Sequence, residues 1–203
     1  MHRARALRMA LAGALMTVVA VAPVAAATPQ PYYQGFETDT YDWTGASRVG
    51  SGTNGISSHS GSWHAQAAPG AFTRWGGYTT EFPVGGYTTS LWIYLDMSTT
   101  AANDTRFDFS SAINTPLGAH RRDFVFNGGF YNDTDATGSG PRFVFSASNN
   151  AGRGSSFPKN PDRDPLTIST TGWYEFRHVF YDNGGVLAVD LEIRSSTGSL
   201  LES

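Results

Sequence analysis

The sequence predicts an all-β protein, and three observations carry this prediction. The residues after position 27 are rich in Gly, Ser, Thr and aromatic side chains, and poor in the Ala, Leu, Glu and Lys that favour helices. Short segments alternate apolar and polar residues, and Gly-, Asn- and Pro-rich turns separate them. No window in this part of the chain has the apolar period of a helix. We therefore expect a two-sheet antiparallel sandwich, formed as a single domain over residues 28–203.

The first 27 residues have the three regions of an export signal. Three arginines precede an apolar run at residues 9–22, and Pro23 and the small residues 24–27 follow it. The run is short for a membrane helix, and no second apolar stretch follows. The sequence thus predicts a signal peptide at 1–27, a secreted protein and no membrane span.

The charge balance excludes some classes of partner. The chain has 14 Lys and Arg against 17 Asp and Glu, and the signal peptide carries three of the arginines. Lys159 is the only lysine, so the polybasic patch that nucleic-acid binding needs is absent from the sequence. The chain also has no cysteine, which excludes disulfides and a thiol nucleophile. We expect a monomer that does not bind nucleic acid.

Four segments show the period of two that is typical of half-buried strands. In each of them, alternate apolar residues are predicted to face the core while the residues between them face water. The segments are 90–95, 106–109, 123–127 and 142–146.

The clearest strands are predicted on either side of Asn183-Gly184, a pair that favours a two-residue type I′ turn. This turn would place Asp182 opposite Gly185. In that register the core-facing pairs are Tyr174–Ile193, Phe176–Leu191, His178–Val189 and Phe180–Leu187, and the outward pairs are Glu175–Glu192 and Arg177–Asp190. His178 is predicted to be a buried side chain. Residues 199–201 are expected to begin a further strand, with the last strand of the sandwich missing.

The pattern over 172–190 resembles the late hairpin of concanavalin A-like and laminin G-like jelly-roll domains. Segments 34–37 and 60–65 are similar to early strands of the same class. Within that class, the chain most resembles an uncharacterised group of secreted bacterial proteins. The resemblance implies a jelly-roll sandwich, but it does not imply one activity, because this fold carries lectins, glycanases and lyases.

Exposed aromatic side chains flanked by polar ones predict a glycan-binding surface. A sugar ring stacks on an aromatic plane, and neighbouring polar groups hold its hydroxyls. Alternation directs one such set away from the core, and it would form a platform if its strands share the concave sheet. The set is Trp92, Tyr94, Arg106, Asp108, Asp123, Asn127 and Tyr131.

An enzyme acting on polysaccharides is the alternative interpretation. Residues 124–132 resemble a segment of jelly-roll alginate lyases, which implies Tyr131 as a catalytic acid/base, with His120, Arg121 or Arg122 to neutralise a uronate. For a glycoside hydrolase, residues 37–42 come close to a Glu-x-Asp-x-x-Glu motif. The predicted Glu175–Glu192 pair would also have the separation of a retaining pair, about 5 Å.

A structural calcium ion is the only cofactor that the sequence indicates. Asp133 and Asp135 place oxygen ligands two residues apart, and Glu37 is a further candidate, although an ordinary turn explains the same pattern. No intact catalytic motif is present. We therefore expect a secreted carbohydrate-binding, lectin-like protein, with a polysaccharide lyase or hydrolase, or a structural or adhesive surface protein, as alternatives.

Overall fold

The structure is a computed structural model, and it describes residues 32–73, 83–115, 117–149 and 158–202. The predicted signal peptide lies outside the described residues. The described part is built from strands and two short 3-10 helices, η1 (Thr53–Gly55) and η2 (Pro161–Arg163). None of its helices is both long and apolar enough to cross a membrane.

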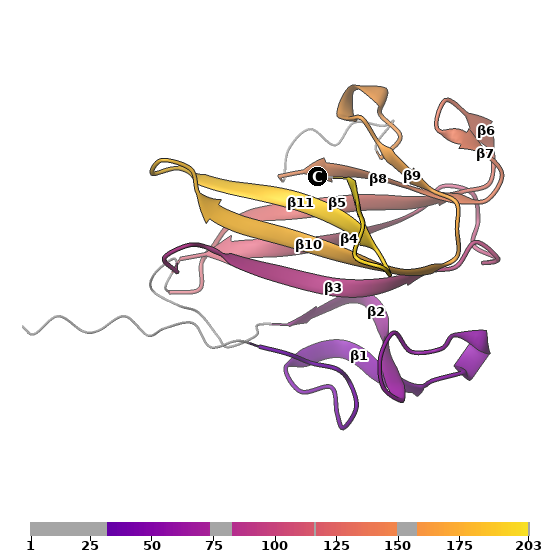
Figure 1. Ribbon diagram of the computed structural model, residues 1–203, viewed down its shortest axis with the longest axis horizontal. Helices are drawn as coiled ribbons and strands as arrows, with labels where there is room; N and C mark the ends of the chain where they lie inside the picture. The colour runs from indigo at the N-terminus through magenta and orange to yellow at the C-terminus, as the bar shows by residue number, and fades with distance from the viewer. Residues whose placement is uncertain (1–31, 74–82, 116, 150–157, 203) are drawn as a thin grey trace, which may run out of the picture.

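Two four-stranded antiparallel sheets form the body of the molecule (Figure 1). Sheet I has the order β12-β11-β10-β3 and sheet II the order β4-β5-β8-β9. Sheet I contains β3 (Tyr87–Leu95), β10 (Gly172–Asp182), β11 (Leu187–Ser195) and β12 (Leu200–Glu202). Sheet II contains β4 (Thr105–Asn114), β5 (His120–Tyr131), β8 (Arg142–Ser148) and β9 (Leu166–Ile168). This arrangement confirms the all-β prediction with antiparallel sheets.

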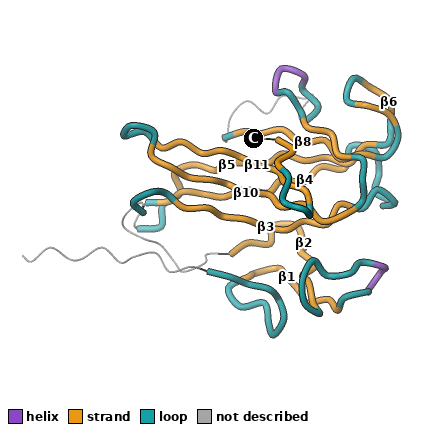
Figure 2. The backbone as a smooth tube through the Cα atoms, in the orientation of Figure 1, coloured by secondary structure: helices purple, strands orange, loops and turns teal. Residues whose placement is uncertain are grey.

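Two small hairpins stand apart from these sheets (Figure 2). One pairs β1 (Trp43–Gly50) with β2 (Trp63–Thr73), and it lies beyond the β3 edge of sheet I (Figure 1). The other pairs β6 (Thr134–Asp135) with β7 (Gly138–Ser139), in the connection from β5 to β8.

Aromatic side chains from both sheets form the core. Phe176 of β10 meets Phe126 of β5 and Phe145 of β8, with ring centroids 5.2 Å and 5.0 Å apart. Phe180 meets Phe124 in the same way at 5.6 Å. These are the faces that alternation assigned to the core, because apolar burial selects one face of each strand.

The other face of β5 and β8 is also buried, which the sequence did not predict. Val125, Asn127 and Tyr131 on β5 and Val144 on β8 point away from the inter-sheet core, yet each is at most 1% exposed. The expectation that these strands leave one face in water is therefore wrong. Among the polar residues on this second face, Asn127 satisfies its hydrogen bonds within the protein, through Asp108 and Ser148.

The β10–β11 hairpin forms, but its register is shifted by two residues from the prediction. Asp182 pairs with Leu187, and the turn is centred on Gly184 and Gly185, whose φ values are 67° and 88°. The central positions of this turn need positive φ, and glycine adopts it without a Cβ clash. The shift of two keeps the core face, so Phe176 now pairs with Ile193. It also places Glu175 opposite Arg194 and Arg177 opposite Glu192 in place of the predicted Glu–Glu pair.

The ends of the described chain give one confirmation and one correction. Residues 200–202 form β12, which pairs with β11 as the predicted start of a strand. Residues 34–37 form no strand. Instead, the side chain of Asp39 accepts hydrogen bonds from Gln34 and from the backbone of Tyr41, which closes an ordinary polar turn.

Candidate functional site

An aromatic cluster lies on the outer face of sheet I. Trp92 and Tyr94 alternate out of β3, and Trp173 points the same way from β10, where it pairs directly with Tyr94. The Tyr94 and Trp173 rings meet edge to face with centroids 5.3 Å apart. The predicted aromatic side chains of β3 thus gain a partner that the prediction did not include.

The loop between β1 and β2 packs against this cluster. The indole N–H of Trp173 donates a 2.8 Å hydrogen bond to the carbonyl of Ser57, 116 positions away in the sequence. The imidazole of His59 stacks on Trp92, with ring centroids 3.7 Å apart and an interplanar angle of 17°. His64 contacts the edge of Trp173, and its Nδ1 lies 3.0 Å from the Ser58 hydroxyl. The hairpin therefore supplies a polar wall opposite the aromatic one.

An open pocket of about 470 Å³ lies between these two walls. Tyr94 and Trp173 give it an apolar side, and the hydroxyls and the imidazole of the loop give it a polar one. Its lining residues are Gly55, Ser57, Ser58, His59, Tyr94, Gly172, Trp173 and Ser196. Because His59 covers a face of Trp92, Tyr94 and Trp173 are the rings that meet the pocket.

Charged side chains continue the outer face of sheet I beyond the aromatic cluster. Glu192 lies 3.3 Å from Arg177 and 2.9 Å from Arg194, and Arg177 also lies 3.9 Å from Glu175. Each glutamate is thus matched by a guanidinium. The arrangement is a charge ladder across β10 and β11, which stabilises the register by cross-strand pairing.

The other predicted binding residues lie on sheet II. Asp108 and Asn127 are direct partners on β4 and β5, joined by a 2.8 Å hydrogen bond, and Ser148 donates to Asn127 at 2.7 Å. Arg106 is paired with Asp104 at 2.6 Å. The platform expected from the sequence is therefore divided: Trp92 and Tyr94 belong to one sheet, and Arg106, Asp108, Asp123, Asn127 and Tyr131 belong to the other. Alternation assigns a side chain to a face, but it does not say which strands share a sheet.

The lyase candidates do not converge on one place. His120, Arg122 and Tyr131 lie on the same strand, β5, and nine residues of strand separate Arg122 from Tyr131 by about 30 Å. His120 pairs with Asp123 at 3.1 Å, and Arg122 donates to the carbonyl of Asn149. The predicted combination of Tyr131 with either residue at one sugar therefore stays a prediction without support from this geometry.

Tyr131 is buried, with 0% of its surface exposed. The ammonium of Lys159 lies over its ring, 4.0 Å from the centroid. Burial raises the pKa of the Tyr131 hydroxyl well above its ordinary value. This environment favours a protonated, packed phenol.

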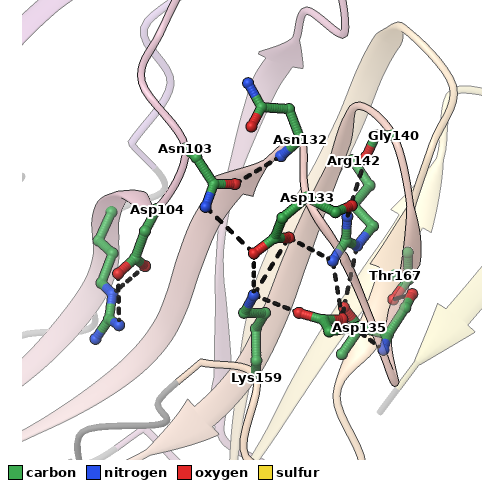
Figure 3. Close-up of polar contacts among 11 residues, drawn as sticks. Asn103, Asp104, Asn132, Asp133, Asp135, Gly140, Arg142, Lys159 and Thr167 are labelled. Atoms are coloured by element: carbon green, nitrogen blue, oxygen red, sulfur yellow. Dashed lines mark hydrogen bonds and ion pairs between the residues drawn. The ribbon is translucent and has the colours of Figure 1, made fainter.

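The acidic residues proposed as calcium ligands are held by protein groups (Figure 3). Asp133 and Asp135 both face Lys159 and Arg142, and the Arg142 Nη2 atom lies 3.0 Å and 2.8 Å from them respectively. Glu37 accepts hydrogen bonds from the backbone N–H groups of Ser62 and Trp63. Within the described ranges, no three His, Cys, Asp or Glu side chains form a group that could hold a metal ion. The calcium site stays a prediction without support from this geometry.

Two features of the site were not predicted from the sequence, for different reasons. Trp173 could have been predicted, because it lies two residues before Glu175 and therefore shares its outward face in either hairpin register. The polar wall could not, because Ser57 and His59 reach the pocket only through a contact between distant segments. Comparison of this chain with protein-family models, with curated proteins and with solved structures found no match, so its interpretation depends on the geometry of the pocket.

Proposed function

We propose that the protein is a secreted glycan-binding β-sandwich of the jelly-roll type, and that it binds its ligand in the pocket on sheet I. The observation that carries the proposal is the pairing of two aromatic rings, Tyr94 and Trp173, with hydroxyl and imidazole groups across an open pocket. A pyranose has an apolar face and a rim of hydroxyls, and this pocket offers a complementary surface to each.

The charges around the pocket favour binding over hydrolysis. A glycosidase needs one carboxyl group that donates a proton and a second one as base or nucleophile. Glu175 and Glu192 are the carboxylates beside the aromatic cluster, and each lies within 4 Å of the Arg177 guanidinium, as part of the charge ladder. Carboxylates that are each paired with an arginine are suited to holding a polar ligand.

The test is retention of the purified protein on a panel of immobilised polysaccharides. We expect retention on at least one glycan, and we expect Tyr94→Ala to weaken it about five- to tenfold, because one stacking contact contributes about 1–1.4 kcal/mol. Tyr181→Ala is the matched control. It removes a tyrosine from the same strand face as Trp173, about 26 Å further along β10.

Each result of this experiment has a clear meaning. Loss of retention in Tyr94→Ala with normal retention in Tyr181→Ala supports the pocket on sheet I. Equal binding by both variants and the unaltered protein would move the site elsewhere. If no glycan is retained, the proposal fails in favour of a structural or adhesive protein. Shortened or unsaturated products would show an enzyme.

A further inference from the structure

The only lysine of the chain lies between two aspartates. Lys159 Nζ is 3.1 Å from Oδ2 of Asp133, and it also contacts Oδ2 of Asp135, 24 positions away in the sequence (Figure 3). The ring of Tyr131 covers the amine from a further side. The half-buried Lys159 amine therefore contacts the carboxyl group of Asp135 on one side and that of Asp133 on another.

The second oxygen of Asp135 is surrounded by hydrogen-bond donors. Oδ1 accepts from the backbone N–H of Thr137 at 2.8 Å and from the Thr137 hydroxyl at 2.6 Å, and the Arg142 Nη2 lies 2.8 Å away. Arg142 is 1% exposed, and the carbonyls of Asp133 and Gly140 hold its other nitrogen in place. Such fixed donors stabilise the negative charge that develops on a carbonyl oxygen when a nucleophile attacks its carbon.

Asp133 is placed to move protons between the two reacting groups. Asn103 donates to its Oδ2 at 3.2 Å and Arg142 to its Oδ1 at 3.0 Å, so its carboxylate is fixed beside the amine. A carboxylate within hydrogen-bond distance of an ammonium can act as its general base. Nucleophile, carboxyl carbon, base and oxyanion donors thus meet in one cluster.

From this arrangement we infer that Lys159 and Asp135 are joined by an intramolecular amide bond. The Nζ–Cγ bond forms, and the bond from Cγ to Oδ2 of Asp135 breaks. Two protons of the ammonium leave through Asp133 and depart with Oδ2 as one molecule of water, and the third stays on the amide nitrogen. The ammonium and the carboxylate supply every atom of the amide and the water, and their opposite charges cancel, so the step needs no oxidant, reductant or other reactant.

Proximity is what makes the condensation favourable. Burial disfavours both charges, but the mutual ion pairs outweigh it, raising the pKa of Lys159 and lowering that of Asp135, so the reaction begins with a proton transfer. Well-oriented intramolecular groups react as if their partner were present at on the order of 10⁵ M or more. The bond would tie the β6–β7 hairpin to the segment before β9, in a chain that has no cysteine for a disulfide.

Intact-protein mass spectrometry under denaturing conditions tests the inference. We expect the mass to be lower than the sequence mass by one water, and a tryptic digest to contain the peptides 123–142 and 154–163 as one branched species. If the intact mass equals the sequence mass and the digest contains only linear peptides, the inference is overturned. A loss of water located within the 123–142 peptide alone also overturns it, because dehydration of an aspartate to a succinimide gives the same mass without a cross-link.

Three variants separate the chemistry from folding. Lys159→Arg keeps the positive charge but lacks the amine, and its mass should equal its sequence mass. Asp135→Asn should reach the same final mass as the unaltered protein, because the same amide then forms with loss of ammonia. Asp133→Asn should form the bond more slowly, as followed in a time course. If Asp135→Asn and Asp133→Asn also keep their full sequence masses, as Lys159→Arg does, Lys159 and Asp135 form only an ion pair.

Discussion

His178 shows how one polar residue is accommodated among aromatic rings. It is 0% exposed, and its ring contacts Phe126 and Phe109, which are strand partners on the core face of sheet II. Its Nε2 lies 3.0 Å from the carbonyl of Phe124, which can only accept, so Nε2 carries the proton. Nδ1 then accepts from the Ser111 hydroxyl at 3.1 Å. The neutral imidazole is satisfied on both sides, which confirms the predicted buried histidine.

Acid is expected to destabilise the protein through His178. Burial lowers its pKa from 6.5 to about 4 in the folded state. Between these two values the unfolded chain binds a proton that the folded chain does not, so the free energy of unfolding falls as the pH falls from 6.5 towards 4. The loss is roughly 3 kcal/mol at most. Urea unfolding at pH 7 and pH 4.5 measures it.

His178→Gln is the control for this prediction, because glutamine retains a donor but does not titrate. Its free energy of unfolding should depend less on pH over the same interval. Carboxylates such as Asp104, whose pKa is lowered in the folded state by its hydrogen bond from Arg106, contribute to acid sensitivity in both proteins, so the difference between the two slopes isolates the histidine. Equal slopes would contradict a proton uptake by His178.

At the scale of elements, the β10–β11 hairpin shows that the turn and the charges select the same register. Asn183 closes the turn by donating to the carbonyl of Val186 at 2.9 Å, and Gly185 donates to the side chain of Asp182 at 2.6 Å. The resulting alignment pairs Arg177 with Glu192, whereas the register predicted from Asn183-Gly184 would have opposed two glutamates. Opposite charges across a strand pair stabilise, and like charges destabilise.

Alanine substitutions in the turn distinguish the two registers. Gly185→Ala should lower the free energy of unfolding by about 1–2 kcal/mol, because a Cβ at its φ of 88° clashes with the backbone. Asn183→Ala should change it by about 0.5 kcal/mol or less, because Asn183 is not among the residues with positive φ. Urea unfolding of both variants measures the difference. A larger loss in Asn183→Ala would place the centre of the turn at Asn183-Gly184.

The whole molecule is held together by aromatic contacts between its two sheets. Phe176 is 0% exposed and touches rings on two strands of sheet II. Within the residues that the structure describes, the β1–β2 hairpin pairs with neither sheet, and it meets sheet I through the hydrogen bond from Trp173 to Ser57 and the stacked His59. The pocket therefore depends on the docking of a separate hairpin onto a stable sandwich.

Removing the Phe176 ring should destabilise both sheets of the sandwich together. Phe176→Ala is expected to cost roughly 3–5 kcal/mol of unfolding free energy, because it leaves a cavity between the sheets. Phe72→Ala removes the same side chain from a site on β2 that is 46% exposed, and its cost should be much smaller. Thermal unfolding followed by circular dichroism compares them. Similar losses in both variants would contradict a core centred on Phe176.

Part of the candidate site follows from local pattern alone. The outward direction of Trp92 and Tyr94 could be predicted because a strand alternates its side chains whatever it pairs with. The same rule identified the apolar face of every predicted strand, and it placed His178 in the core in either register. These properties belong to one segment of chain, so the sequence of that segment was sufficient.

Only the tertiary structure decided which of these segments meet. It separated Trp92 and Tyr94 from Asn127 and Tyr131 by placing them on different sheets, and it buried the second face of β5. It also brought Ser57 to Trp173 and Lys159 to Asp135. Such contacts join positions far apart in the sequence, and their free energy depends on both partners and on the register between them. The residues of a single strand therefore determine its faces, while the packing of the whole chain determines what each face contacts.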